Sequence, residues 1–207
     1  MKKINWDYGS IEKLGADFFG ELGNIGTGAA VTALSNMIRS TVSVSVPHVM
    51  NLEDERLLEY LDSFGEREMG LLFPIRGEIS GLLLYILKED FLAKVLEHLG
   101  TEFEKLLEST DNVWIFKEVA GIMASAYFSS VSAYLERRIE IDEPAILSEM
   151  TGAAVMETRC MVPGDPKGNL CVECGFYLQA PENASHLILM LTEESAEEIF
   201  TSLGVVV

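Results

Sequence analysis

Apolar residues recur at helical spacing through the first forty residues of the chain. The apolar face comprises Leu22, Ile25, Ala29, Ala33, Met37 and Ile38. This spacing predicts a buried amphipathic helix, which we expect to run from a cap at Ser10 to about Ile38.

Strand and short-helix patterns follow this first helix. The expected elements are a strand over 41–46 whose pairing ends at Pro47, an acidic helical connection over 52–64, two strands over 68–75 and 79–87 joined by a turn over 76–78, and a helix over 89–99 closed by Gly100. The first hundred residues thus predict a helix–strand–hairpin–helix unit.

The pattern then begins again. The expected elements are a long helix over 111–135, a strand over 138–141, a strand pair over 170–178 and 186–191, and a last helix over 193–203 closed by Gly204. A shift of 97 residues places Glu118 on Glu21 and Pro144 on Pro47. An internal repeat of this size decides the architecture.

We therefore expect one α+β domain over residues 1–207, a tandem pseudo-twofold repeat with copies at about 10–105 and about 107–207. Two three-stranded pieces would join as one mostly antiparallel sheet, flanked by the two long helices. The stretch 149–169 would be a looser insertion in the second copy.

The composition restricts the partners. The 207 residues carry a formal net charge of −18, which argues against nucleic acid or an anionic membrane as a partner. No signal peptide is recognisable, and the longest strongly apolar run, Ile79–Leu87, is short for a membrane span. We expect a soluble, cytoplasmic protein. Because the duplication supplies the symmetry that a dimer would give, we also expect a monomer.

The three cysteines, Cys160, Cys171 and Cys174, fit a reducing compartment. The Cys-x2-Cys spacing invites a zinc interpretation, but it falls in an expected strand, where residues three apart face opposite sides. A structural zinc site also needs four ligands, and only Cys160 and His186 could complete it. We expect no metal site, and the cysteines have no assigned role.

Glu21 and Asn24 are the candidate chemical residues of the first helix. Three positions apart, they lie side by side on one helical face. Glycines surround them, at positions 20, 23, 26 and 28. Interior glycines destabilise a helix, so they indicate close packing or a surface that a partner must approach. The alternative is a helix-crossing seam that happens to carry two exposed polar residues.

The second copy does not repeat this pair. Glu118 keeps the place of Glu21, but Gly121 replaces Asn24 and Trp114 replaces Asp17. We expect Trp114 and Gly121 to be packing residues. The second site, Glu118, Gly121 and Pro144, is then degenerate.

These residues carry a family resemblance. The pattern Asp17-x3-Glu21-x2-Asn24-x22-Pro47 resembles that of the CheC/CheX/FliY chemotaxis phosphatases, and the surrounding Glu-Leu-Gly-Asn-Ile-Gly-Thr-Gly-Ala-Ala is also similar to theirs. Length and duplication are most similar to CheC.

The resemblance implies hydrolysis of the aspartyl phosphate on a CheY-type response regulator. It implies that Glu21 pairs with the regulator's active-site lysine and that Asn24 positions the attacking water, with Asp17 and Pro47 in supporting roles. Mg²⁺ would come with the regulator, and the chain would need no cofactor of its own. The alternative that it leaves open is a non-catalytic adaptor that binds a CheD-type receptor deamidase.

Overall fold

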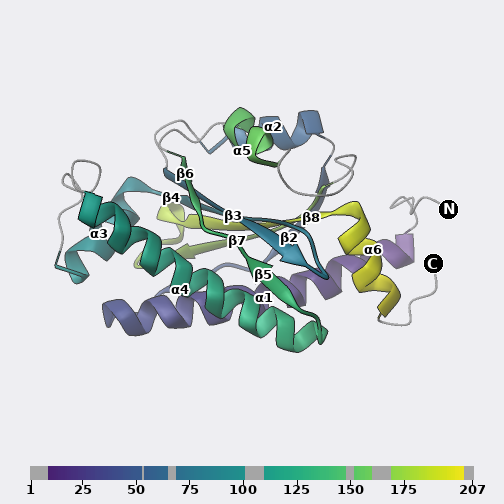
Figure 1. Cartoon of the computed structure of the whole chain (residues 1–207), viewed down its shortest axis with the longest axis horizontal. Coiled ribbons are helices and arrows are strands. Elements are labelled where there is room, and N and C mark those ends of the chain that lie inside the picture. The colour runs from purple at the N-terminus through teal and green to yellow at the C-terminus, as the bar shows by residue number, and fades with distance from the viewer. Residues whose placement is uncertain are drawn as a thin grey trace.

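Helices and strands alternate in the same order in the two halves of the chain (Figure 1). The structure is a computed structural model, and it describes residues 9–52, 54–64, 69–100, 110–147, 152–159 and 169–202. The first half contains α1 (Gly9–Ile38), β1 (Ser43–Val44), β2 (His48–Leu52), α2 (Asp54–Asp62), β3 (Met69–Gly77), β4 (Gly81–Leu87) and α3 (Glu89–His98). The second half contains α4 (Thr110–Leu135), β5 (Ile139–Ile141), β6 (Ala145–Leu147), α5 (Gly152–Arg159), β7 (Asn169–Tyr177), the 3₁₀ helix η2 (Pro181–Asn183), β8 (Ser185–Thr192) and α6 (Glu193–Ser202).

The two long helices, α1 and α4, end in the same way. Arg39 follows α1 and Glu136 follows α4, each in the left-handed conformation with φ 53°. In both copies the amide of the next residue donates to the carbonyl five residues before it, over 3.2 Å. This pairing closes a helix C-terminus.

The α+β class and the tandem pseudo-twofold repeat are confirmed, whereas the copy boundary near residues 105–107 lies outside the described residues and stays a prediction.

The sheet is built by exchange of strands between the two copies. All described pairings are antiparallel, in the order β1-β7-β8-β4-β3-β5, with β2 also on β7 and β6 also on β3. The strands that follow α1 therefore pair with the hairpin of the second copy, and those that follow α4 pair with the hairpin of the first. The expected three-stranded pieces exist, but each contains strands of both copies.

A one-residue bulge lies in each exchanged segment. Three residues separate the paired positions Val44 and His48, whereas two separate their partners on β7. The second copy has the same mismatch against β3, between β5 and β6. Pro47 and Pro144 lie within these bulges, where the lack of an N–H breaks no ladder bond. The prediction that pairing ends at Pro47 is wrong, because the strand resumes on the same neighbour as β2.

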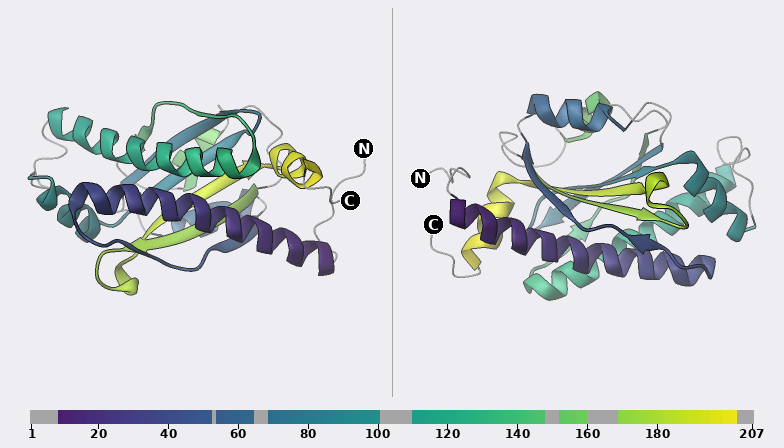
Figure 2. Two further views of the ribbon diagram at one scale, coloured as in Figure 1. Left: turned by 90° about the horizontal axis from the view of Figure 1, so that it is seen from below. Right: turned by 180° about the vertical axis from the view of Figure 1, so that it is seen from behind.

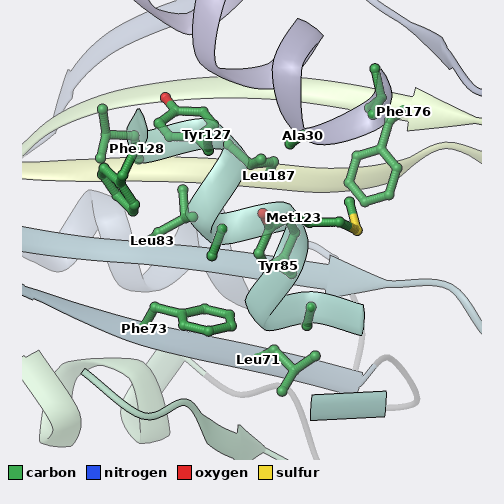
Figure 3. Packing of buried hydrophobic residues seen from close by; sticks show 14 of the residues in the cluster. Ala30, Leu71, Phe73, Leu83, Tyr85, Met123, Tyr127, Phe128, Phe176 and Leu187 are labelled. Atoms are coloured by element: carbon green, nitrogen blue, oxygen red, sulfur yellow. The ribbon is translucent and has the colours of Figure 1, made fainter. Parts of the chain in front are cut away.

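Helices cover both faces of the sheet (Figures 1 and 2). The long helices α1 and α4 lie side by side on one face, and α2 and α5 pack together on the other. Alternate residues of the central strand β4 therefore enter different cores. Leu83 and Tyr85 belong to the larger core under the long helices, and Leu84 and Ile86 to the smaller core under α2 and α5. Figure 3 shows the larger core, where Tyr127 of α4 lies among the residues of the sheet.

Part of the expected insertion over 149–169 is a regular element of the repeat. Residues 152–159 form α5, which holds the place of α2 in the second copy and packs against it. The prediction of a loose insertion is therefore wrong for residues 152–159. Residues 149–151 and 160–168 lie outside the described part of the chain. The hairpin turn lies at 78–80 and not at 76–78. Gly100 has the expected left-handed φ of 77° after α3, and Gly204 lies outside the described residues.

Among the described helices, none combines the length and the apolar character that crossing a membrane requires.

The strand exchange predicts that half of the chain does not fold alone as a monomer. A fragment of residues 1–107 keeps α1, β1 and β2 but loses β7, against which β1 and β2 pair. We expect no cooperative thermal transition by circular dichroism for this fragment as a monomer, and recovery of the transition when residues 108–207 are co-expressed. A monomeric fragment that unfolds cooperatively would contradict the observed pairing.

Candidate active site

The polar residues of the site lie along one outer face of α1. Asp17, Glu21 and Asn24 have exposed side chains at positions i, i+4 and i+7 of the helix. Within the described part of the chain, no hydrogen bond or ion pair engages Glu21 or Asn24. The structure thus brings the three residues together, as the spacing predicts, with both groups of the central pair directed to solvent.

Gly23 lets the inner face of α1 approach the sheet. A Cβ added there would lie 2.6 Å from Cγ1 of Val172, 3.4 Å from Cβ of Pro47 and 3.5 Å from Sγ of Cys174. A larger residue fits at the first of these distances only if the Val172 side chain or the helix shifts. The bulge at Pro47 therefore packs directly against the helical turn that carries Asn24.

Gly26 makes the corresponding approach to α4. A Cβ at this position would lie 2.5 Å from the ring of Tyr127, which is fully buried. Gly20 and Gly28 differ, since a Cβ at Gly20 would meet only Val49 at 3.9 Å and one at Gly28 would meet nothing within 4 Å. Close packing therefore explains Gly23 and Gly26, as the alternative interpretation expected. Glu21 and Asn24 lie on the opposite face of α1.

The bulge also exposes an apolar residue beside the site. Val46 is 87% exposed, the most exposed of the large hydrophobic side chains in the described ranges. It directly precedes Pro47, which contacts the Asn24 turn through Gly23. The expected alternating strand did not indicate this exposure. A proline after an apolar strand residue is the signal that could have suggested it.

The cysteines take no part in this surface. Cys171 and Cys174 are buried on opposite faces of β7, as the strand pattern predicts, and Cys160 lies outside the described residues. Burial raises the pKa of the Cys174 thiol to about 11, so this thiol is protonated at neutral pH. Within the described ranges, no cluster of three or more His, Cys, Asp or Glu side chains is arranged to hold a metal ion. His186 instead pairs with Glu173, with 2.7 Å between Nδ1 and Oε1.

The equivalent surface of the second copy is exposed and more apolar. Glu118 is exposed on α4, and a Cβ at Gly121 would meet nothing within 4 Å. Trp114 is 66% exposed. The prediction that Trp114 and Gly121 are packing residues is therefore wrong, because both lie on the outer face of the helix. Pro144 lies in its bulge as Pro47 does, but no carboxamide takes the place of Asn24.

The comparisons with known proteins agree with the sequence pattern. The CheC-like family matches residues 14–50, a segment that contains Asp17, Glu21, Asn24 and Pro47. The CheY-P phosphatase CheC of Bacillus subtilis (strain 168) is 19% identical over 203 residues, which cover 95% of this chain and 97% of that protein. The chain is therefore similar to CheC over nearly its whole length.

Solved structures share the fold of this chain. Thermotoga maritima FliY has a TM-score of 0.69 at 19% identity, covering 92% of this chain and 96% of that one. The FliM middle domain from H. pylori has a TM-score of 0.63 at 14% identity, covering 92% and 98%. The CheX-CheY-BeF3-Mg complex from Borrelia burgdorferi matches with a TM-score of 0.56 at 15% identity, covering 82% and 96%. At these identities the likeness concerns the fold.

Paired substitutions at Gly26 and Gly28 separate the inner face of α1 from the outer. Gly28→Ala should raise the free energy of unfolding by up to about 1 kcal/mol, because alanine favours the helix and the site has room. Gly26→Ala should lower it by about 1–3 kcal/mol, because its Cβ overlaps the Tyr127 ring. Urea titration measures both, and equal stability of the two variants would contradict the packing described.

Proposed function

We propose that this chain is a phosphatase for the aspartyl phosphate of a CheY-type response regulator, with one working site at Glu21 and Asn24. The observation that carries the proposal is the outward-facing pair on α1, seated on its inner side by Gly23 and Gly26. Two relatives support the substrate class: CheC is named a CheY-P phosphatase, and CheX has been solved with CheY, BeF3 and Mg²⁺.

The proposed reaction requires little covalent chemistry from the side chains of this protein. An acyl phosphate is already activated, and its phosphoryl group transfers through a loose transition state, so the catalyst chiefly has to hold a water in line with the phosphorus. The carboxamide of Asn24 suits this task, because it can accept a hydrogen bond from the water through its oxygen and donate through its nitrogen. Mg²⁺ would be held by the regulator.

Glu21 is poorly suited to this role, because its carboxylate and the phosphoryl group repel each other. A carboxylate at such a site is better matched to a cation of the partner. In this proposal it pairs with a lysine beside the phosphorylated aspartate, which aligns the two proteins. Asp17, one turn earlier, supports that contact, and Pro47 holds the helical turn through Gly23.

Replacement of Asn24 tests the chemical role. We expect Asn24→Ala to slow stimulated phosphate release by about 100-fold, because the water loses its positioning group. The measurement is phosphate release from a phosphorylated CheY-type receiver domain, with the circular dichroism spectrum unchanged. Asn36→Ala is the matched control, since Asn36 is also exposed on α1, three turns further on. Wild-type turnover in Asn24→Ala would contradict a site centred on Asn24, whereas no phosphate release by the wild-type chain would favour the alternative, an adaptor for a CheD-type deamidase.

Replacement of Glu21 tests recognition separately. Glu21→Gln keeps the size of the side chain but removes its charge, so we expect the affinity for the receiver domain to fall by about 10-fold or more. The loss should appear in KM more than in kcat, and it should shrink at high salt as the wild-type contact is screened. Glu55→Gln, an exposed position on α2 on the other face of the sheet, is the control. A fall in kcat alone would assign Glu21 to the chemical step instead.

A further inference from the structure

We infer that the outer face of α4 is a second docking site for the same class of partner, a CheY-type receiver domain, which it binds without hydrolysing the phosphate. This α4 face consists of Trp114, Ile115, Glu118, Gly121 and Ile122. The inference rests on the proposed function, because it takes its partner from there.

Apolar side chains are concentrated on α4 in a way that packing does not explain. Six large hydrophobic side chains are exposed in the described ranges, and three of them, Trp114, Ile115 and Ile122, lie on the α4 face. Trp114 is 66% exposed, Ile122 43% and Ile115 36%. Exposed apolar groups gathered on one helix mark an interaction surface, and tryptophan is enriched among residues that dominate binding energy.

The α4 face has the same structural setting as the working site. Glu118 stands 97 residues after Glu21, and Gly121 stands 97 after Asn24. Both helices end in a left-handed residue, and each is followed by a strand segment with a one-residue bulge. A partner that fits the α1 surface therefore meets a closely similar backbone on α4.

The second copy keeps the carboxylate that the proposal assigns to partner recognition, and it lacks the carboxamide that the proposal assigns to the water. Glu118 keeps the charge that, at Glu21, recognises the partner, and it is exposed. Gly121 lacks the carboxamide that positions water, and its surroundings are open, so a partner's backbone can approach closely. Trp114 replaces the carboxylate of Asp17 with an apolar anchor. Such a surface can hold a receiver domain but has no group to direct a water at its phosphate.

A second copy of this chain is a less suitable occupant. Each chain carries a formal net charge of −18, so two copies repel each other at long range. A symmetric contact through α4 would also place the exposed Glu118 side chains of the two chains on the same surface. The receiver domain of the proposed reaction avoids this, because it brings a lysine to the carboxylate.

The test counts receiver domains bound per chain. The probe is a CheY-type receiver domain carrying Mg²⁺ and beryllofluoride, so that nothing is hydrolysed, and phosphate release from its phosphorylated form is measured in parallel. Isothermal titration calorimetry and sedimentation should give two receiver domains per wild-type chain. Trp114→Ala and Glu118→Gln should each reduce this to one, or weaken the second binding event by at least about 10-fold. Glu55→Gln on α2 should keep two.

Four results would overturn the inference. One receiver domain per wild-type chain, with phosphate release intact, would remove the second site and leave the proposed function standing. Two per chain in both variants would place the second site elsewhere. Sedimentation of the wild-type chain alone as a dimer that Trp114→Ala dissociates would assign the α4 face to a second copy. Absence of both binding and phosphate release would reject the proposed function together with the inference.

Discussion

Close packing of α1 against two neighbours at once is the contact on which the site depends. Within one helical turn, Gly23 lies against the sheet and Gly26 against the ring of Tyr127 on α4. Because neither position carries a side chain, the helix backbone contacts both neighbours directly. A rotation or shift of α1 would open one of these contacts or cause a steric overlap at the other. The face that bears Glu21 and Asn24 is therefore held in a fixed direction. Pre-organisation of this kind suits the proposed reaction, in which the main task is to hold a water in place.

The bulge at Pro47 extends this arrangement to the sheet. A regular strand would continue its ladder past α1, whereas the extra residue bends the strand and places proline against the Asn24 turn. The same bend turns Val46 out to solvent. The site is thus formed by a helix and a strand, both anchored in the larger core, and not by loops. A rigid platform of this type suits a surface that acts on a group carried by another protein.

Much of this architecture could be predicted from local patterns. The long helices follow from apolar spacing, and the 97-residue shift reveals both the duplication and the loss of the carboxamide at Gly121. Strand exchange could not be predicted, because antiparallel pairing of β1 with either hairpin satisfies the same alternation of residues. The exposure of Trp114 was missed for a related reason: hydrophobicity indicates a preference for burial but not which helical face meets the core. For Gly23 and Gly26, the sequence shows that something is close, and only the fold shows that it is β7 and Tyr127.

Strand exchange also bears on how the two halves can differ. A single copy of this unit would leave the strands after its long helix without their neighbour unless a second chain supplied the hairpin, as in a symmetric dimer. In such a dimer one codon specifies the corresponding position of both helices, so a change at that position alters both surfaces together. Joining the halves in one polypeptide removes that constraint while the interlocked sheet is kept. Residue 24 and residue 121 can then be inherited and selected independently. The outer faces of α1 and α4 can therefore serve different uses in one chain.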